Sequence, residues 1–178
     1  PYVADALREA AGGGARRVLA VVTSAYPSYS GCRQYREDLA DALAELAAEG
    51  RVIAVDKVRH YADHPGFVAP NADAVDAALT DLEAVTGEYG HVLFVTHSIP
   101  VAMDETAGPA GGAYTATHRD VCEAVAARVS ERRGRSVGWD LVYCSRSGPP
   151  EQRWLEPDVN DHLEDLVSAG VAGVVAAP

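Results

Sequence analysis

The sequence contains few cysteines and no long hydrophobic run. Its 178 residues include three cysteines, Cys32, Cys122 and Cys144, and none of them forms a CxxC pair. An odd number of widely separated cysteines predicts neither a disulfide framework nor a complete zinc site, so a reducing cytoplasm is the expected location. Because no apolar run approaches the roughly 18 residues of a membrane span, we expect no membrane-spanning segment.

Positive charge is also scarce. Lysine and arginine together number 15 against 26 acidic residues, which gives a formal net charge of −11. Proteins that bind a phosphate backbone need clustered cations, so nucleic acid is not an expected partner. Hydrophobic residues make up 48% of the chain, as in ordinary globular proteins. Nothing in this composition indicates an oligomeric state.

Short apolar runs alternate with stretches of helical period. The apolar runs predict strands at residues 17–22, 52–55, 92–95, 141–143 and 171–176. The first run is continuous and β-branched, which predicts a strand buried on both faces. Helical spacing predicts helices over 33–48, 72–88, 114–133 and 157–170, and residues 59–70 are predicted to form a loop. This alternation predicts an α/β fold with parallel sheets flanked by helices.

Three loops follow predicted strands at their carboxyl ends, where ligands bind in open parallel sheets. They cover residues 23–33, 96–114 and 145–157. His97 is the second residue of the second loop, and a neutral imidazole there suits both ferrous iron binding and proton acceptance near pH 7. Its position alone is equally compatible with a histidine that only fastens its own loop. Likewise, Tyr29 is compatible with simple packing and Cys32 with the small-residue start of a helix.

The other histidines carry weaker signals. His60 and His64 lie in a polar loop with Asp63, a combination that is compatible with metal binding but is more often simply solvated. His118, followed by Arg-Asp on a predicted helix, is interpreted as a surface residue. His91 begins a strand and His162 lies within a helix, and neither is assigned a role.

The remaining polar and sulfur-containing candidates also have simple structural interpretations. Cys122 lies on an apolar helical stripe and Cys144 ends a strand, so both are predicted to be small core residues. Asp104 and Glu105 follow the His97 loop and are interpreted as an exposed turn.

Three ordered motifs together resemble the ferrochelatase family. They are VTSAYPSYSGCRQY at residues 22–35, FVTHSIP at 94–100 and WLEP at 154–157. They occur in the order and at about the spacing of that family, over essentially the whole chain. The closest likeness is to the branch from high-GC Gram-positive bacteria, which acts on coproporphyrin III.

The resemblance implies a chelatase-like fold of two Rossmann-like domains with a porphyrin cleft between them. Residues 1–88 would form the later part of the first domain, and residues 89–178 most of the second. Both ends of the family fold, including the acidic residue that faces the active-site histidine, would lie outside this sequence. The implied activity is that of a lyase of haem biosynthesis, which inserts ferrous iron into coproporphyrin III or a closely related porphyrin.

The resemblance also implies roles for particular residues. His97 matches the catalytic histidine, which would bind ferrous iron, accept pyrrole protons or do both. Tyr29 matches a residue that lines the porphyrin site. Cys32 matches one ligand of a [2Fe–2S] cluster whose other cysteines lie outside the sequence, so this chain alone is not expected to hold the cluster. Two alternatives stay open on the same fold: a cobalt or nickel type II chelatase, and a non-catalytic tetrapyrrole or metal carrier.

Overall fold

The computed structural model describes residues 2–178, which form two compact parts. Unit 1 extends to Tyr61, and unit 2 runs from Ala62 to Pro178. Each unit contains its own parallel sheet. The two units are therefore described separately.

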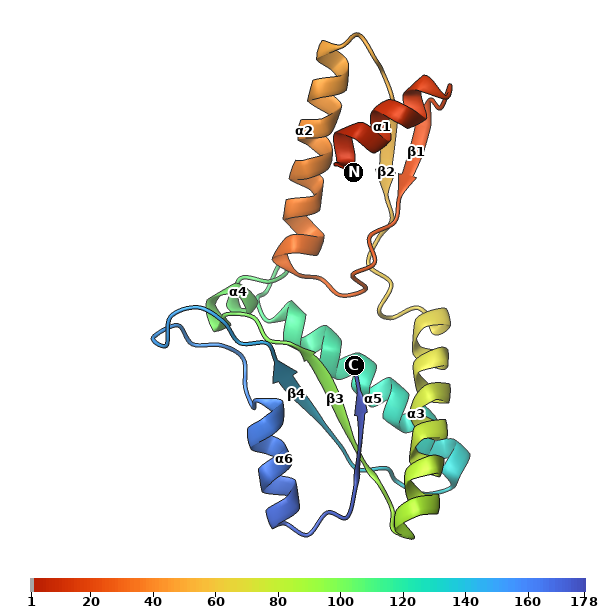
Figure 1. Cartoon of the computed structure of the whole chain (residues 1–178), viewed down its shortest axis with the longest axis vertical. Coiled ribbons are helices and arrows are strands. Elements are labelled where there is room, and N and C mark those ends of the chain that lie inside the picture. The colour runs from red at the N-terminus through yellow and green to blue at the C-terminus, as the bar shows by residue number, and fades with distance from the viewer. Residues whose placement is uncertain (1) are drawn as a thin grey trace. The chain divides into compact units, whose positions relative to one another are not determined.

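Unit 1 is built from one pair of parallel strands and the helices around it. Its elements are α1 (Val3–Gly12), β1 (Arg17–Ala20), η1 (Ser30–Gln34), α2 (Tyr35–Ala48) and β2 (Ala54–Lys57) (Figure 1). Strands β1 and β2 run parallel, with Arg17 opposite Ala54. Leu7 and Leu46, from α1 and α2, lie in a small buried core together with Ile53. These apolar contacts hold the helices against the strand pair.

The prediction that the first strand is buried on both faces is wrong for the described part of the chain. Along β1, exposed and half-buried residues alternate. Val18 packs against the core of unit 1, whereas Leu19 is 65% exposed. Successive strand residues point to opposite faces, so only one face of β1 is covered in unit 1.

Unit 2 contains a sheet of three parallel strands with the longest in the middle. Its elements are α3 (Pro65–Thr86), β3 (His91–His97), α4 (Val101–Glu105), α5 (Ala113–Arg133), β4 (Trp139–Cys144), α6 (Val159–Ser168) and β5 (Val174–Ala177). The strand order is β4-β3-β5, and both pairings are parallel. The predicted α/β class with parallel sheets and flanking helices is therefore confirmed.

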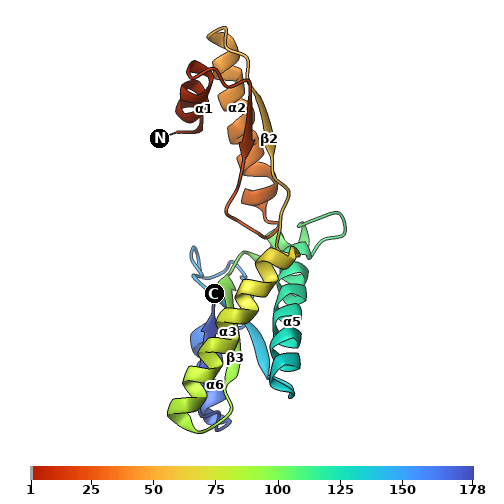
Figure 2. The ribbon, with the colours of Figure 1, turned by 90° about the vertical axis from the view of Figure 1, so that its right-hand side faces the viewer.

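Helices α5 and α6 cover opposite faces of this sheet, as Figure 2 shows. Thr96 of β3 bonds to His118 of α5, whereas His91 of β3 and His162 of α6 both bond to Asp140 of β4. His91 and Thr96 are five positions apart along β3, and successive side chains alternate between the two faces of a strand, so these two side chains point to opposite faces. The core of β3, from Val92 to Phe94, is accordingly buried on successive residues. This double coverage explains its continuous apolar run.

Helix α3 begins earlier than the sequence pattern indicated. Residues 65–70, predicted as loop, form its first turns because Pro65 occupies a first-turn position and the His64 side chain accepts a hydrogen bond from the Gly66 amide. The helix packs against α5 in unit 2, where Arg133 bonds to Asp76 and Glu83 at 2.6 and 2.8 Å. The compact parts thus divide at Tyr61, and the family-based division at residue 88 stays a prediction.

Helices α3 and α5 are the longest, with 22 and 21 residues. Across residues 2–178, no helix is both long and apolar enough to cross a membrane.

Candidate active site

His97 is the last residue of β3 and lies at the carboxyl end of the strand, as predicted. Its side chain is exposed, and its Nδ1 lies 2.5 Å from the carbonyl oxygen of Ser98. Because a carbonyl only accepts hydrogen bonds, Nδ1 must carry the proton. The Nε2 lone pair is then available to bind a metal ion or accept a proton.

The loops after β3 and β4 pair with each other beside His97. The Leu155 amide donates to the Ile99 carbonyl at 3.0 Å, and the Val101 amide donates to the Arg153 carbonyl at 3.0 Å. The buried Ser98 hydroxyl donates to the Leu155 carbonyl at 2.8 Å. Two motifs separated by more than fifty residues therefore form one hydrogen-bonded structure.

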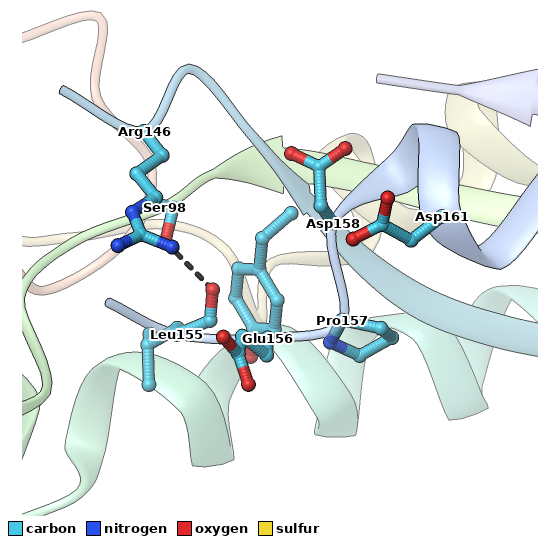
Figure 3. A pocket seen from close by; sticks show the side chains of 8 residues that line it. Ser98, Arg146, Leu155, Glu156, Pro157, Asp158 and Asp161 are labelled. Carbon is cyan, nitrogen blue, oxygen red and sulfur yellow. Dashed lines mark hydrogen bonds between the residues drawn. The ribbon is translucent and has the colours of Figure 1, made fainter. Parts of the chain in front are cut away.

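A pocket of about 470 Å³ opens at these paired loops (Figure 3). It is lined by Ser98, Tyr143, Arg146, Leu155, Glu156, Pro157, Asp158 and Asp161. Asp158 also caps α6, since its carboxylate accepts a hydrogen bond from the Asn160 amide at 2.9 Å. With three carboxylates against one guanidinium, the lining favours small cationic or neutral polar groups over anions.

Behind His97 lies a buried polar cluster formed by Thr96, Tyr114 and His118. The prediction that His118 is a surface residue is wrong, because its side chain is 4% exposed. Its Nε2 lies 2.9 Å from the Thr96 hydroxyl, and its Nδ1 lies 2.8 Å from the Tyr114 carbonyl oxygen. The Tyr114 hydroxyl donates to the His97 carbonyl at 2.8 Å. The cluster therefore connects helix α5 to the end of β3.

The hydrogen-bond chemistry assigns the protons in this cluster. The Tyr114 carbonyl can only accept, so His118 carries its proton on Nδ1 and accepts the Thr96 hydroxyl proton at Nε2. Burial lowers the pKa of His118, although the bond to the Tyr114 carbonyl opposes this shift, so the imidazole is neutral near pH 7. Burial also raises the pKa of Tyr114, which keeps its hydroxyl protonated as a donor.

Asp104 lies in the interior and not in the exposed turn that the sequence indicated. Its side chain, on α4, is 8% exposed. One carboxylate oxygen accepts hydrogen bonds from the Tyr114 and Thr115 amides at 3.1 and 3.2 Å, and the other accepts from the Thr115 hydroxyl at 2.6 Å. Helix α5 begins after Gly112, which has no side chain that could cap the helix. Asp104 therefore caps α5 from another element.

The two other candidate site residues lie in unit 1. Tyr29 is 51% exposed. Cys32 lies in η1 with an exposed thiol, and its Sγ is 4.0 Å from the Nε2 of His60. Gly31 allows this approach, because a Cβ at that position would meet the His60 nitrogen at 3.0 Å. The ring of Tyr29 and the thiol of Cys32 are therefore both accessible in unit 1.

Residues 2–178 contain no arrangement of three or more His, Cys, Asp or Glu side chains that could hold a metal ion. Cys122 is buried in α5, as predicted, and burial raises the pKa of its thiol to about 12. Cys144 ends β4 and is half-buried, which makes it less enclosed than the predicted core residue. Neither thiol is therefore an exposed ligand in this structure.

Two histidines without an assigned role meet at a single carboxylate. The Nε2 atoms of His91 and His162 both lie 2.9 Å from one carboxylate oxygen of Asp140. Desolvation acts to raise the pKa of Asp140, but the bonds from His162 and His91 outweigh it, so the net shift is downward. This cluster connects β3, β4 and α6.

The lowered pKa of Asp140 predicts a pH-dependent contribution to stability. A carboxyl group whose pKa is lower in the folded than in the unfolded state stabilises the fold above the unfolded value, about 3.9, and loses that contribution as the pH falls through the folded value. We therefore expect the stability difference between the parent and an Asp140→Asn variant to shrink as the pH falls from about 5 to below 3. Urea unfolding at several pH values measures this difference; a gap independent of pH would contradict the assignment.

Comparison with known proteins supports the resemblance found in the motifs. The family model described as Ferrochelatase matches residues 1–178. The coproporphyrin III ferrochelatases of Streptomyces coelicolor and Streptomyces griseus are each 52% identical to this chain over 184 residues, covering 100% of the chain and 49% of each relative. The corresponding protein of Frankia alni is 47% identical over 178 residues, covering 100% of the chain and 46% of that relative.

The chain spans about half the length of the curated relatives it matches. The family match, however, extends over the whole chain. The chain therefore belongs to the ferrochelatase family.

Proposed function

We propose that the full-length gene product inserts ferrous iron into coproporphyrin III, as a metal chelatase of haem biosynthesis. The relatives named above are coproporphyrin III ferrochelatases, and the present chain aligns with them along its entire length. The observation that carries the proposal is the exposed His97 imidazole at the carboxyl end of β3. Iron is the substrate of this reaction, not a resident cofactor.

The geometry of His97 suits the chemistry of metal insertion. As ferrous iron replaces the pyrrole protons of the macrocycle, those protons must be accepted by a base or by water. With Nδ1 donating its proton to the Ser98 carbonyl, the Nε2 lone pair of His97 can serve either the metal or a proton. We assign His97 the catalytic role on this basis.

We place the porphyrin against the exposed surface near His97 and not inside the acidic pocket of unit 2. From the family resemblance alone, we also propose Tyr29 as a porphyrin-binding residue. Coproporphyrin carries anionic carboxylate side chains. The pocket presents Glu156, Asp158 and Asp161, which would repel such groups. An aromatic side chain such as Tyr29, already half exposed, can instead stack on the flat macrocycle.

We also propose Cys32 as one thiolate ligand of a [2Fe–2S] cluster in the full-length protein. A cluster of this kind takes four thiolates. The described residues do not supply such a set by themselves, because the chain has only three cysteines and one of them, Cys122, is buried. The exposed thiol of Cys32 fits a single ligand. All three cysteines are free, in keeping with the reducing cytoplasm that we propose as the location.

The proposed reaction is tested directly with the full-length gene product under anaerobic conditions. We expect the fluorescence of coproporphyrin III to disappear after addition of ferrous iron, at a rate proportional to protein concentration. Parallel assays use protoporphyrin IX with ferrous iron, and a reduced tetrapyrrole with cobalt or nickel. Faster turnover with protoporphyrin IX would show that coproporphyrin III is not the preferred substrate. Turnover only with cobalt or nickel would favour a cobalt or nickel type II chelatase.

The carrier alternative predicts a different result. A carrier would bind coproporphyrin III and shift its absorption spectrum, yet iron insertion would stay at the rate measured without protein. Binding without catalysis would therefore overturn the enzymatic proposal.

A further inference from the structure

We infer that Tyr114 is a positioning residue for His97, an inference that rests on the proposed function. The Tyr114 hydroxyl donates a 2.8 Å hydrogen bond to the carbonyl oxygen of His97. His97 is the last residue of β3, and the N–H of the peptide that follows, on Ser98, donates at 2.8 Å to the carbonyl of Cys144, the last residue of β4. A side chain from α5 thereby holds the backbone at the point where the imidazole projects.

Tyr114 is itself held from three directions. Its side chain is 6% exposed, and its ring packs against that of His118 with centroids 4.3 Å apart. Its backbone amide donates to Asp104, and its hydroxyl lies 3.3 Å from the Thr96 hydroxyl. Few rotamers are compatible with these contacts. The hydroxyl is therefore a fixed anchor for the His97 peptide.

This anchoring has a consequence for the His97 ring. The imidazole Nδ1 forms a hydrogen bond with the Ser98 carbonyl, which lies one peptide further along the chain, so the ring orientation depends on the direction of the His97–Ser98 peptide that precedes it. The same peptide direction is constrained by Tyr114 at the His97 carbonyl. Without the hydroxyl, this peptide would be held on one side only, by the bond from the Ser98 amide to the Cys144 carbonyl, and the Nε2 lone pair would take a wider range of directions. Partners that orient a metal-binding histidine typically affect activity by 10–100-fold.

The test replaces Tyr114 by phenylalanine, which keeps the buried ring and removes only the hydroxyl. In the full-length gene product we expect the kcat of iron insertion to fall about tenfold, with the KM for porphyrin changed by less than about twofold. Ser130→Ala is the matched control. Ser130 lies on the same helix and its hydroxyl bridges the Ala126 carbonyl and the Val137 amide, so its loss removes comparable bonds far from His97 in the sequence. This control should lower stability without lowering kcat.

A double variant separates positioning from general structural damage. If Tyr114 acts through His97, Tyr114→Phe should lower kcat in the parent but add no further loss in a His97→Ala background. Full additivity, or an unchanged kcat in the single variant beside an inactive His97→Ala, would overturn the inference and leave the proposed function standing.

An independent readout covers the case in which the parent inserts no iron and the proposed function fails. The ¹⁵N chemical shifts of the His97 imidazole report its tautomer. In the parent we expect the Nδ1–H tautomer, and in Tyr114→Phe a shift toward the average of both tautomers. Identical imidazole signals in the two proteins would show that Tyr114 does not position His97.

Discussion

Replacement of His97 by alanine is expected to lower the kcat of iron insertion by about 10²–10⁴-fold, the usual contribution of a general acid or base. The side chain is exposed and makes its hydrogen bond to the neighbouring Ser98 carbonyl, so the fold should survive its removal. Porphyrin binding should change little, because the macrocycle is expected to be held mainly by apolar and aromatic contacts. Steady-state turnover and porphyrin titration with the full-length gene product measure the two effects separately.

His64→Asn is the matched control for this prediction. His64 is also an exposed histidine of unit 2, and its side chain caps α3 by accepting from the Gly66 amide. Asparagine keeps an acceptor at the cap, so turnover and stability should both stay near the parent values. Near-parental turnover in a folded, porphyrin-binding His97→Ala variant would show that another residue carries the chemistry.

Replacement of Asp104 by alanine is expected to destabilise unit 2 by about 2–4 kcal/mol. The substitution leaves the Tyr114 amide, the Thr115 amide and the Thr115 hydroxyl without their acceptor, and each unsatisfied buried donor costs about 1–3 kcal/mol before relaxation and hydration offset part of it. Removal of the negative charge at the start of α5 adds a smaller loss. Thermal unfolding should show a Tm lower by roughly 10 °C.

Two variants delimit the Asp104 effect. Asp104→Asn keeps one acceptor oxygen, so we expect it to be more stable than Asp104→Ala and less stable than the parent. Glu105→Ala changes the adjacent carboxylate, which is exposed, and surface substitutions of this kind usually stay within about 0.5 kcal/mol. Equal stability of Asp104→Ala and Glu105→Ala would contradict the assignment of Asp104 as the cap of α5.

The sequence predicted the elements best where a strand is covered on both faces. The apolar run at Val92–Val95 located β3, and the placement of His97 at its carboxyl end followed directly. Prediction was weaker in unit 1, because the burial of β1 depends on which faces are covered, and local composition does not contain that information. The start of α3 was missed since the Pro and Gly content of residues 59–70 favoured a loop, although Pro65 also suits a first helical turn.

The buried polar cluster behind His97 was missed for a different reason. His118 was judged by the charged residues that follow it, and Asp104 by its polarity. Helical spacing contained the better signal: residue 118 lies four positions before Cys122, which was correctly predicted to be buried on an apolar helical stripe. The acceptor role of Asp104 had no such signal, since its partners lie ten and eleven residues away across a loop.

The pairing of the loops after β3 and β4 has a consequence for local unfolding. The amides of Val101 and Leu155 donate across this pair, and the buried Ser98 hydroxyl adds a third bond. Segments tied in this way open together with the elements that flank them and not as independent flaps. We therefore expect the backbone around His97 to have the same free energy of local unfolding as the three-stranded sheet. Substitutions that destabilise the sheet should then also increase the fraction of molecules in which the site is unfolded.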